Sequence, residues 1–279
     1  MTAVLELEIV QLGGSDGLPL LFLGPSLGTT ATTLWAIAGA SLAADFQTFA
    51  WNLPGHGGSA PAAGPFTLTE LAQATGRAID TAAQGRPVHY AGNSLGGAVG
   101  LQLLLDRPRL IHTATLVCTG ARIGTAESWQ ERAALVRAKG TAATVEGSAR
   151  RWFAPDFRHR EPAVAKALLQ ALCAADDASY AWACDALAVF DVRHRLAEIR
   201  TPVLVVAGAE DQPTPVATLR AIADGVGNGR MVVLDNVAHL APVETPRTIA
   251  QLIAGHARPR RTESGAELGD ARSIGRAND

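Results

Sequence analysis

The stretch Gly92-Asn93-Ser94-Leu95-Gly96 holds a serine in a setting that suits a nucleophile. It follows the apolar run 88–91 and precedes a second apolar stretch with the length of a helix. A serine at a sharp turn between a strand and a helix presents its hydroxyl beside the positive N-terminus of that helix, and the flanking glycines leave room for the strained backbone. We therefore predict that Ser94 is a nucleophile.

A serine hydroxyl attacks efficiently only when a base takes its proton and an acid orients that base. Asp211 and His239 each lie in a loop that directly follows a short apolar run of strand character. Because the carboxyl ends of parallel strands meet at one edge of a sheet, both loops are expected near Ser94. We predict His239 as the base and Asp211 as the acid, with Glu210 as the alternative acid.

The charge that develops on an attacked carbonyl oxygen needs two backbone N–H donors. The amide of Leu95, directly after the serine, is one candidate. The glycine-rich segment 24–29 offers the other, and we select the amide of Leu27, since Pro25 has no N–H. His56 lies in a second glycine-rich turn and is predicted to be structural.

The sequence carries none of the common signatures of metal or cofactor binding: a Walker A lysine motif, His-Glu-x-x-His, or Gly-x-Gly-x-x-Gly opening a first helix. We expect an enzyme that uses no metal and no cofactor and acts on a small molecule. A net charge of −2 gives no indication of nucleic acid as a partner. The sequence says nothing about oligomeric state.

The chain has no signal peptide at its N-terminus and no apolar run of the ~20 residues that span a bilayer, so we expect a cytoplasmic protein that does not bind membranes. The three cysteines have no Cys-x-x-Cys spacing, and we predict buried thiols.

Seven short apolar runs alternate with segments of helical character, which predicts an α/β fold with a mostly parallel sheet covered by helices on both faces. The expected strands are 4–10, 19–23, 46–51, 88–91, 113–118, 202–207 and 231–234. Outside 122–197, the expected helices are 33–44, 68–83, one following the serine turn, 216–223 and 244–255. The alternation stops at Arg122, and residues 122–197 read as helices only, at 127–139, 141–152, 162–174 and 179–190.

We therefore predict a core formed by residues 1–121 and 198–256, and a helical lid formed by residues 122–197. Residues 257–279 lack apolar periodicity and are predicted to be a disordered tail.

These residues resemble the 3-oxoadipate enol-lactonase family of the α/β-hydrolases from about residue 20 to about residue 255. The motifs that carry the resemblance are Ser26-Leu27-Gly28-Thr29-Thr30, Gly55-His56-Gly57-Gly58-Ser59, Asn93-Ser94-Leu95-Gly96-Gly97, Cys118-Thr119-Gly120-Ala121-Arg122-Ile123-Gly124, Trp129-Gln130-Glu131-Arg132, Arg151-Trp152-Phe153, Ala238-His239-Leu240 and Val243-Glu244-x-Pro246.

The resemblance implies a serine hydrolase that opens a carboxylated enol-lactone to 3-oxoadipate in the β-ketoadipate route of aromatic breakdown. Two alternatives stay open. One is another hydrolase on the same core, such as a carboxylesterase or a carbon–carbon bond hydrolase. The other is a non-catalytic binding protein on the same scaffold, since fold does not fix function.

A carboxylated substrate needs a cation in its pocket, and arginine offers a two-pronged match to a carboxylate. Arg122 and Arg132 are our candidates, and Trp129 is predicted to wall the ring. The chain departs from the family at Pro54, where members usually have an arginine, and at Pro25, where they have a small polar residue.

Overall fold

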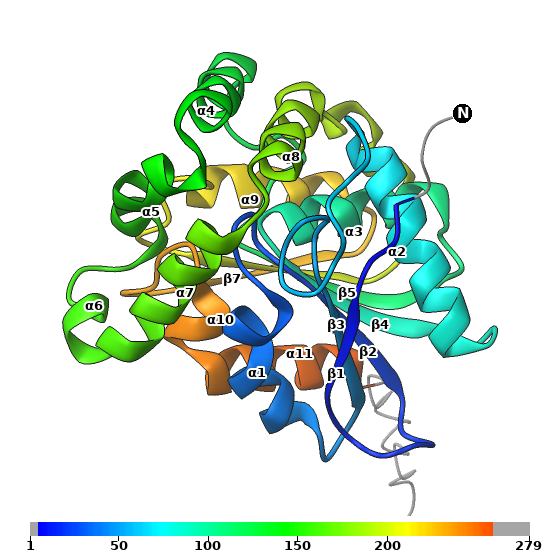
Figure 1. Ribbon diagram of the computed structural model, residues 1–279. Coiled ribbons are helices and arrows are strands. Elements are labelled where there is room, and N and C mark those ends of the chain that lie inside the picture. Colours follow the sequence, from blue (N-terminus) through cyan, green and yellow to red (C-terminus); the bar gives the residue numbers. More distant parts are fainter. Residues whose placement is uncertain (1–4, 259–279) are drawn as a thin grey trace, which may run out of the picture.

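The computed structural model describes residues 5–258 of the chain, and its centre is a twisted sheet of seven strands (Figure 1). The strand order is β1-β3-β2-β4-β5-β6-β7. Only β1 runs antiparallel to its neighbour, β3. The strands are β1 (Ile9–Gly13), β2 (Leu20–Gly24), β3 (Gln47–Trp51), β4 (Val88–Asn93), β5 (Ile111–Val117), β6 (Val203–Gly208) and β7 (Gly229–Leu234).

Helices cover both faces of the sheet, as the alternation predicted. Figure 1 shows α1 and α11 together on one face, and α2, α3 and α9 on the other. Every residue of β2 and β6 is buried, which is what a strand between two helical layers requires. The helices of this core are α1 (Ala31–Leu42), α2 (Leu68–Ala83), α3 (Leu95–Asp106), α9 (Val216–Gly225), α10 (Ala241–Glu244) and α11 (Pro246–Ala257).

Between β5 and β6 the chain forms helices and connecting loops at the carboxyl end of the strands (Figure 1). These elements are α4 (Ala126–Lys139), η1 (Thr141–Thr144), α5 (Val145–Trp152), α6 (Phe157–Arg160), α7 (Pro162–Ala174), α8 (Asp177–Val189) and η2 (Arg193–Glu198). We call residues 122–197 the helical insert; that it acts as a lid stays a prediction.

Local capping explains where several helices begin. Thr67 accepts a hydrogen bond from the amide of Glu70, whose carboxylate in turn accepts from the amide of Thr67, so two free N–H groups at the start of α2 are satisfied. Thr125 and Ser128 do the same at the start of α4. Pro162 opens α7, at a position where the missing N–H has no consequence.

The structure corrects several expected boundaries. The first strand begins at Ile9, because its antiparallel partner β3 ends at Trp51, opposite Ile9. The expected helix 244–255 is two helices, because Pro246 has no N–H to continue the hydrogen-bond ladder from α10. The expected helix 141–152 begins as the 3-10 turn η1, and α6 and η2 were not predicted.

The expected tail begins one residue too early. Ala257 is the last residue of α11 and is buried, as is His256 before it. Residues 259–279 lie outside the described part of the chain. Along residues 5–258, no helix combines the length and the apolar character needed to cross a membrane.

Two segments that are far apart in sequence meet closely at the serine turn. The amide of Gly96 donates to the carbonyl oxygen of Pro25 at 2.8 Å, which ties the start of α3 to the loop after β2. A Cβ atom at Gly96 would lie 2.4 Å from the carbonyl carbon of Gly24 and 2.6 Å from its oxygen. Only glycine lets these two backbones approach so closely.

We expect Gly96→Ala to lower the free energy of unfolding by about 1–3 kcal/mol, the usual consequence of overpacking, since neither backbone can move away cheaply. Gly255→Ala is the matched control, because a Cβ there meets nothing within 4 Å and alanine favours helix α11. Urea denaturation of both variants measures the difference. Equal stability of the two variants would contradict the close packing.

Candidate active site

Ser94 occupies the turn between β4 and α3 in a backbone conformation that is unusual for a residue with a side chain, with φ 54° and ψ −117°. Its neighbours hold it there. The Ser94 amide donates to the carbonyl oxygen of Val117 at 2.9 Å, and the hydroxyl of Thr119 donates to the Ser94 carbonyl at 2.6 Å. Strain of this kind persists only where the surroundings enforce it, and it directs the hydroxyl out of the sheet edge.

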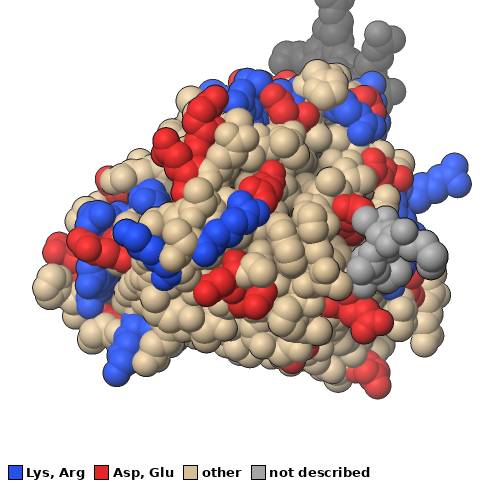
Figure 2. All heavy atoms as spheres, turned by 45° about the horizontal axis from the view of Figure 1, so that its top comes forward, with Lys and Arg blue, Asp and Glu red and all other residues tan. Residues whose placement is uncertain are grey.

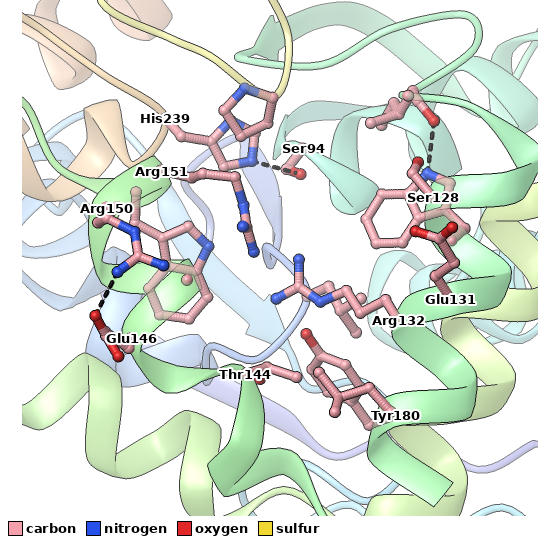
Figure 3. A pocket seen from close by; sticks show the side chains of 18 of the residues that line it. Ser94, Ser128, Glu131, Arg132, Thr144, Glu146, Arg150, Arg151, Tyr180 and His239 are labelled. Carbon is pink, nitrogen blue, oxygen red and sulfur yellow. Dashed lines mark hydrogen bonds and ion pairs between the residues drawn. The ribbon is translucent and has the colours of Figure 1, made fainter.

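The structure brings together Ser94, His239 and Asp211 in one hydrogen-bonded chain, of which Figure 3 shows the bond between His239 and Ser94. His239 Nε2 lies 2.8 Å from Ser94 Oγ, and His239 Nδ1 lies 3.0 Å and 3.1 Å from the two carboxylate oxygens of Asp211. If Nδ1 carries the proton and donates it to the carboxylate, Nε2 is left to accept from the hydroxyl. The three residues are only 3 to 7% exposed.

Asp211 is held as a carboxylate although it is buried. Burial alone would raise its pKa, but His239 and two hydrogen bonds from Thr214 outweigh that effect and lower the pKa below its ordinary value. The Thr214 amide donates at 3.0 Å and its hydroxyl at 2.6 Å. A fixed negative charge next to Nδ1 favours the tautomer that leaves Nε2 free to act as a base.

The alternative acid lies elsewhere. Glu210 is exposed and lines a separate surface cavity with Phe153, Arg158 and Gln212. Asp235, in the loop before His239, is also exposed. Neither residue contacts the histidine in the described part of the chain.

The amides of Leu95 and Leu27 lie in the two segments that meet at the serine turn. Within residues 5–258 neither amide donates a hydrogen bond to another protein group, so both are available to an oxyanion. The loop that carries Leu27 is fixed from both sides: Trp35 Nε1 donates to the Gly24 carbonyl at 2.9 Å, and His56 Nε2 accepts from the Gly28 amide at 3.2 Å.

His56 acts on this loop as a neutral side chain. Its Nδ1 lies 2.9 Å from the Pro54 carbonyl oxygen, to which it donates, and its ring stacks on Tyr180. Complete burial lowers the pKa of His56 to about 4, so Nε2 stays an acceptor at neutral pH. The position agrees with the structural role expected for this residue.

A pocket of about 570 Å³ opens above Ser94 and His239, between the carboxyl edge of the sheet and the helical insert. Leu27 lines it from the core, and α4, α5 and α8 supply most of the rest. The lining includes Trp129, Arg132, Thr144, Arg151, Trp152 and Tyr180.

Two guanidinium groups extend into this pocket between Ser94 and Tyr180 (Figure 3). Arg132 donates to the Ser148 hydroxyl at 2.7 Å and lies over the rings of Trp129 and Tyr180, with 5.8 Å and 5.6 Å to the ring centroids. Its buried Nε has no hydrogen-bond partner within residues 5–258, and neither has the hydroxyl of Tyr180.

Arg151, on α5, is the second cation. Burial and the charge of Arg132 both lower the pKa of Arg151. Neither arginine forms an ion pair with a carboxylate in the described part of the chain. Two partly buried cations without a counter-ion make the pocket a place where an anion is stabilised.

Arg122 does not belong to the pocket, contrary to expectation. It lies on the loop after β5, where its charge adds to the hydrogen bonds from Arg193 that lower the pKa of Asp191. Arg151 and Tyr180 also line the pocket and were not among the residues predicted from the sequence. The Arg151-Trp152-Phe153 motif was the available signal for the first, whereas no pattern singled out Tyr180 on α8.

The outer surface over the helical insert shows no single sign of charge: Figure 2 shows acidic and basic side chains mixed on this face. At the rim of the pocket, Arg150 forms an ion pair with Glu146. Arg132 and Arg151, by contrast, line the pocket and have no carboxylate partner within residues 5–258. Within residues 5–258, no three His, Cys, Asp or Glu side chains are grouped to hold a metal ion.

Comparisons with known proteins agree with this geometry. The model of the α/β-hydrolase family matches residues 20–252. The 3-oxoadipate enol-lactonase 2 of Acinetobacter baylyi is 32% identical over 234 residues, which cover 84% of this chain and 86% of that protein. The crystal structure of the enol-lactonase from Burkholderia xenovorans LB400 has a TM-score of 0.86 at 27% identity and covers 92% of this chain and 99% of its own.

An esterase is also similar. A pimeloyl acyl-carrier-protein methyl ester esterase of Neisseria meningitidis is 31% identical over 214 residues, which cover 71% of this chain and 78% of that protein. Together these matches confirm the predicted α/β fold and the resemblance to the enol-lactonases.

Proposed function

Because the chain belongs to the α/β-hydrolase family, we propose that it is a serine hydrolase that opens a carboxylated enol-lactone, 3-oxoadipate enol-lactone, to 3-oxoadipate. One observation carries the proposal: the hydrogen-bonded chain of Ser94, His239 and Asp211 opens into a pocket that holds two unpaired arginines. The first part is the chemistry of ester cleavage, and the second part is the recognition of an acid.

In the proposed reaction Ser94 Oγ attacks the lactone carbonyl carbon while His239 Nε2 takes the hydroxyl proton. The carbonyl oxygen becomes an oxyanion, which the amides of Leu27 and Leu95 stabilise. When the intermediate collapses, the bond to the ring oxygen breaks, and that oxygen leaves as an enol with the proton from His239. The ring is then open and its acyl carbon is bonded to Ser94.

The second half of the reaction repeats these steps with water. His239 takes a proton from a water molecule, whose oxygen attacks the acyl carbon. Ser94 leaves with the proton, and the product is a carboxylic acid. The enol that was released in the first half converts to a ketone, so the reverse attack on the acyl-enzyme is disfavoured. The Asp211 carboxylate stabilises the imidazolium of His239 in both halves.

The helical insert supplies the specificity in this proposal. Arg132 and Arg151 would bind the substrate carboxylate, and the Trp129 ring would lie beside the lactone. The family's usual arginine is absent at Pro54, whose carbonyl instead accepts from His56. The positive charge comes from the helical insert.

Turnover of the enol-lactone tests the function directly. We expect the purified protein to consume 3-oxoadipate enol-lactone, followed by its ultraviolet absorbance, and Ser94→Ala to lower kcat by about 10⁴-fold or more, since the residual rate comes only from binding and the oxyanion donors. Circular dichroism shows that the variant is folded. If the wild type hydrolyses p-nitrophenyl acetate but leaves the enol-lactone intact, the protein is an esterase like its Neisseria relative.

Arg132→Ala tests the recognition of the carboxylate. We expect the KM for the carboxylated enol-lactone to rise about 10- to 100-fold, as the loss of a charge-assisted hydrogen bond predicts. Hydrolysis of uncharged p-nitrophenyl acetate should change little. Arg122→Ala is the control, because this arginine lies outside the pocket. Equal losses on both substrates, or an equal effect of the control, would contradict the assignment.

A further inference from the structure

Glu244 joins the loop that carries His239 to the helical insert. Its carboxylate accepts a hydrogen bond from the amide of Ala238 and another from the amide of Ala154, both at 3.3 Å. Ala238 directly precedes His239. Ala154 lies two residues after Trp152, at the end of the helix that brings Arg151 into the pocket.

The backbone makes one further link between the same two segments. The amide of Leu240 donates to the carbonyl oxygen of Trp152 at 3.2 Å. His239 therefore lies between two attachments to the helical insert, the Glu244 carboxylate on one side and the Leu240 amide on the other. A change in either one alters where the imidazole lies relative to Ser94.

We propose that Glu244 is a positioning residue, whose carboxylate holds the His239 loop against the end of α5 and so keeps the imidazole in line with Ser94 and Asp211. The inference rests on the proposed function, because it concerns the alignment of the general base. It adds a residue that does not touch the reacting atoms but couples them to the pocket.

The burial of Glu244 and the charges around it determine whether its carboxylate is ionised. Burial raises the pKa of Glu244 from 4.5 to about 7, and the negative charge of Asp211 acts in the same direction. The amides of Ala238 and Ala154 and the charge of Arg160 on α6 lower the pKa and only partly offset the burial. Near neutral pH the carboxylate is therefore close to losing its charge.

The sign of the effect on stability follows from this shift. A carboxyl group whose pKa is higher in the folded state than in the unfolded state contributes stability below pH 4.5, and this contribution is lost as the pH rises through about 7. Ionised Glu244 thus opposes folding while it serves as an acceptor for two amides. Because the ionised carboxylate of Glu244 does not stabilise the fold, its hydrogen bonds are better explained by a role in aligning the site.

The proposal predicts a steep acidic limb in the dependence of kcat/KM on pH. Protonation of the His239 imidazole removes the base. Protonation of Glu244 below pH about 7 removes an acceptor from the loop that holds that base. Each proton lowers the rate, so the slope of log kcat/KM against pH should exceed one in the range where Glu244 becomes protonated.

Glu244→Gln, assayed with p-nitrophenyl acetate, tests the inference without relying on the lactone. Glutamine has nearly the same size, but its NH₂ group cannot accept from one of the two amides. We expect kcat at pH 8 to fall about tenfold through misalignment, KM to change less than about twofold, and the slope of the acidic limb to fall to one. Glu161→Gln, at an exposed position, is the control and should keep the wild-type profile.

The decrease in melting temperature between pH 5 and pH 8 should be smaller in Glu244→Gln than in the wild type. A variant that keeps the wild-type kcat and the wild-type slope of the acidic limb would overturn the proposal. So would a variant that loses activity but keeps that slope, since this is what a merely structural residue predicts. Should the variant not fold, a slope of one in the wild type overturns the proposal on its own. Failure of the proposed function looks different, because the wild type would then leave the enol-lactone intact, whatever Glu244→Gln does to the hydrolysis of p-nitrophenyl acetate.

Discussion

The structure depends on one contact above all, the hydrogen bond between the imidazole of His239 and the hydroxyl of Ser94. The two residues lie 145 positions apart in the chain, so the bond exists only if β4 and β7 end at the same edge of the sheet. Close packing of Gly96 on the loop after β2 fixes the serine. Asp211 fixes the tautomer of the histidine. The parallel sheet thus brings loops that are distant in sequence together at one edge, where they form the site.

The helical insert adds the second constraint, a positive charge removed from water. Arg132 and Arg151 have no carboxylate partner in the described residues, and burial together with the charge of Arg132 lowers the pKa of Arg151. Such a pair destabilises the protein without a ligand, because only a nearby anion compensates for the desolvation of a cation. The pocket is therefore suited to an acid, and it would place that acid beside the hydroxyl of Ser94.

Much of the fold and of the candidate site followed from the sequence, for identifiable physical reasons. Buried parallel strands are continuous apolar runs, and the capping box at Thr67 marks a helix start, so both can be read locally. The turn at Ser94 has a signature of its own. The sequence could not show which of Arg122 and Arg132 lies in the pocket, because no pattern around them distinguishes the two. Only the packing of α4 on α8 directs Arg132 inward. The role of Glu244 likewise depends on a contact with the distant residue Ala154.

The most direct test of the central claim is the rate at which a fluorophosphonate probe modifies Ser94, because this rate measures the nucleophile itself without any assumption about substrate. Peptide mapping by mass spectrometry identifies the modified residue. The geometry predicts fast modification of Ser94 in the wild type and in Glu210→Gln, and a rate lowered by several orders of magnitude, up to about 10⁴-fold, in Asp211→Asn. Modification at another residue, or equal rates in the two variants, would contradict the arrangement of Ser94, His239 and Asp211 as a catalytic unit.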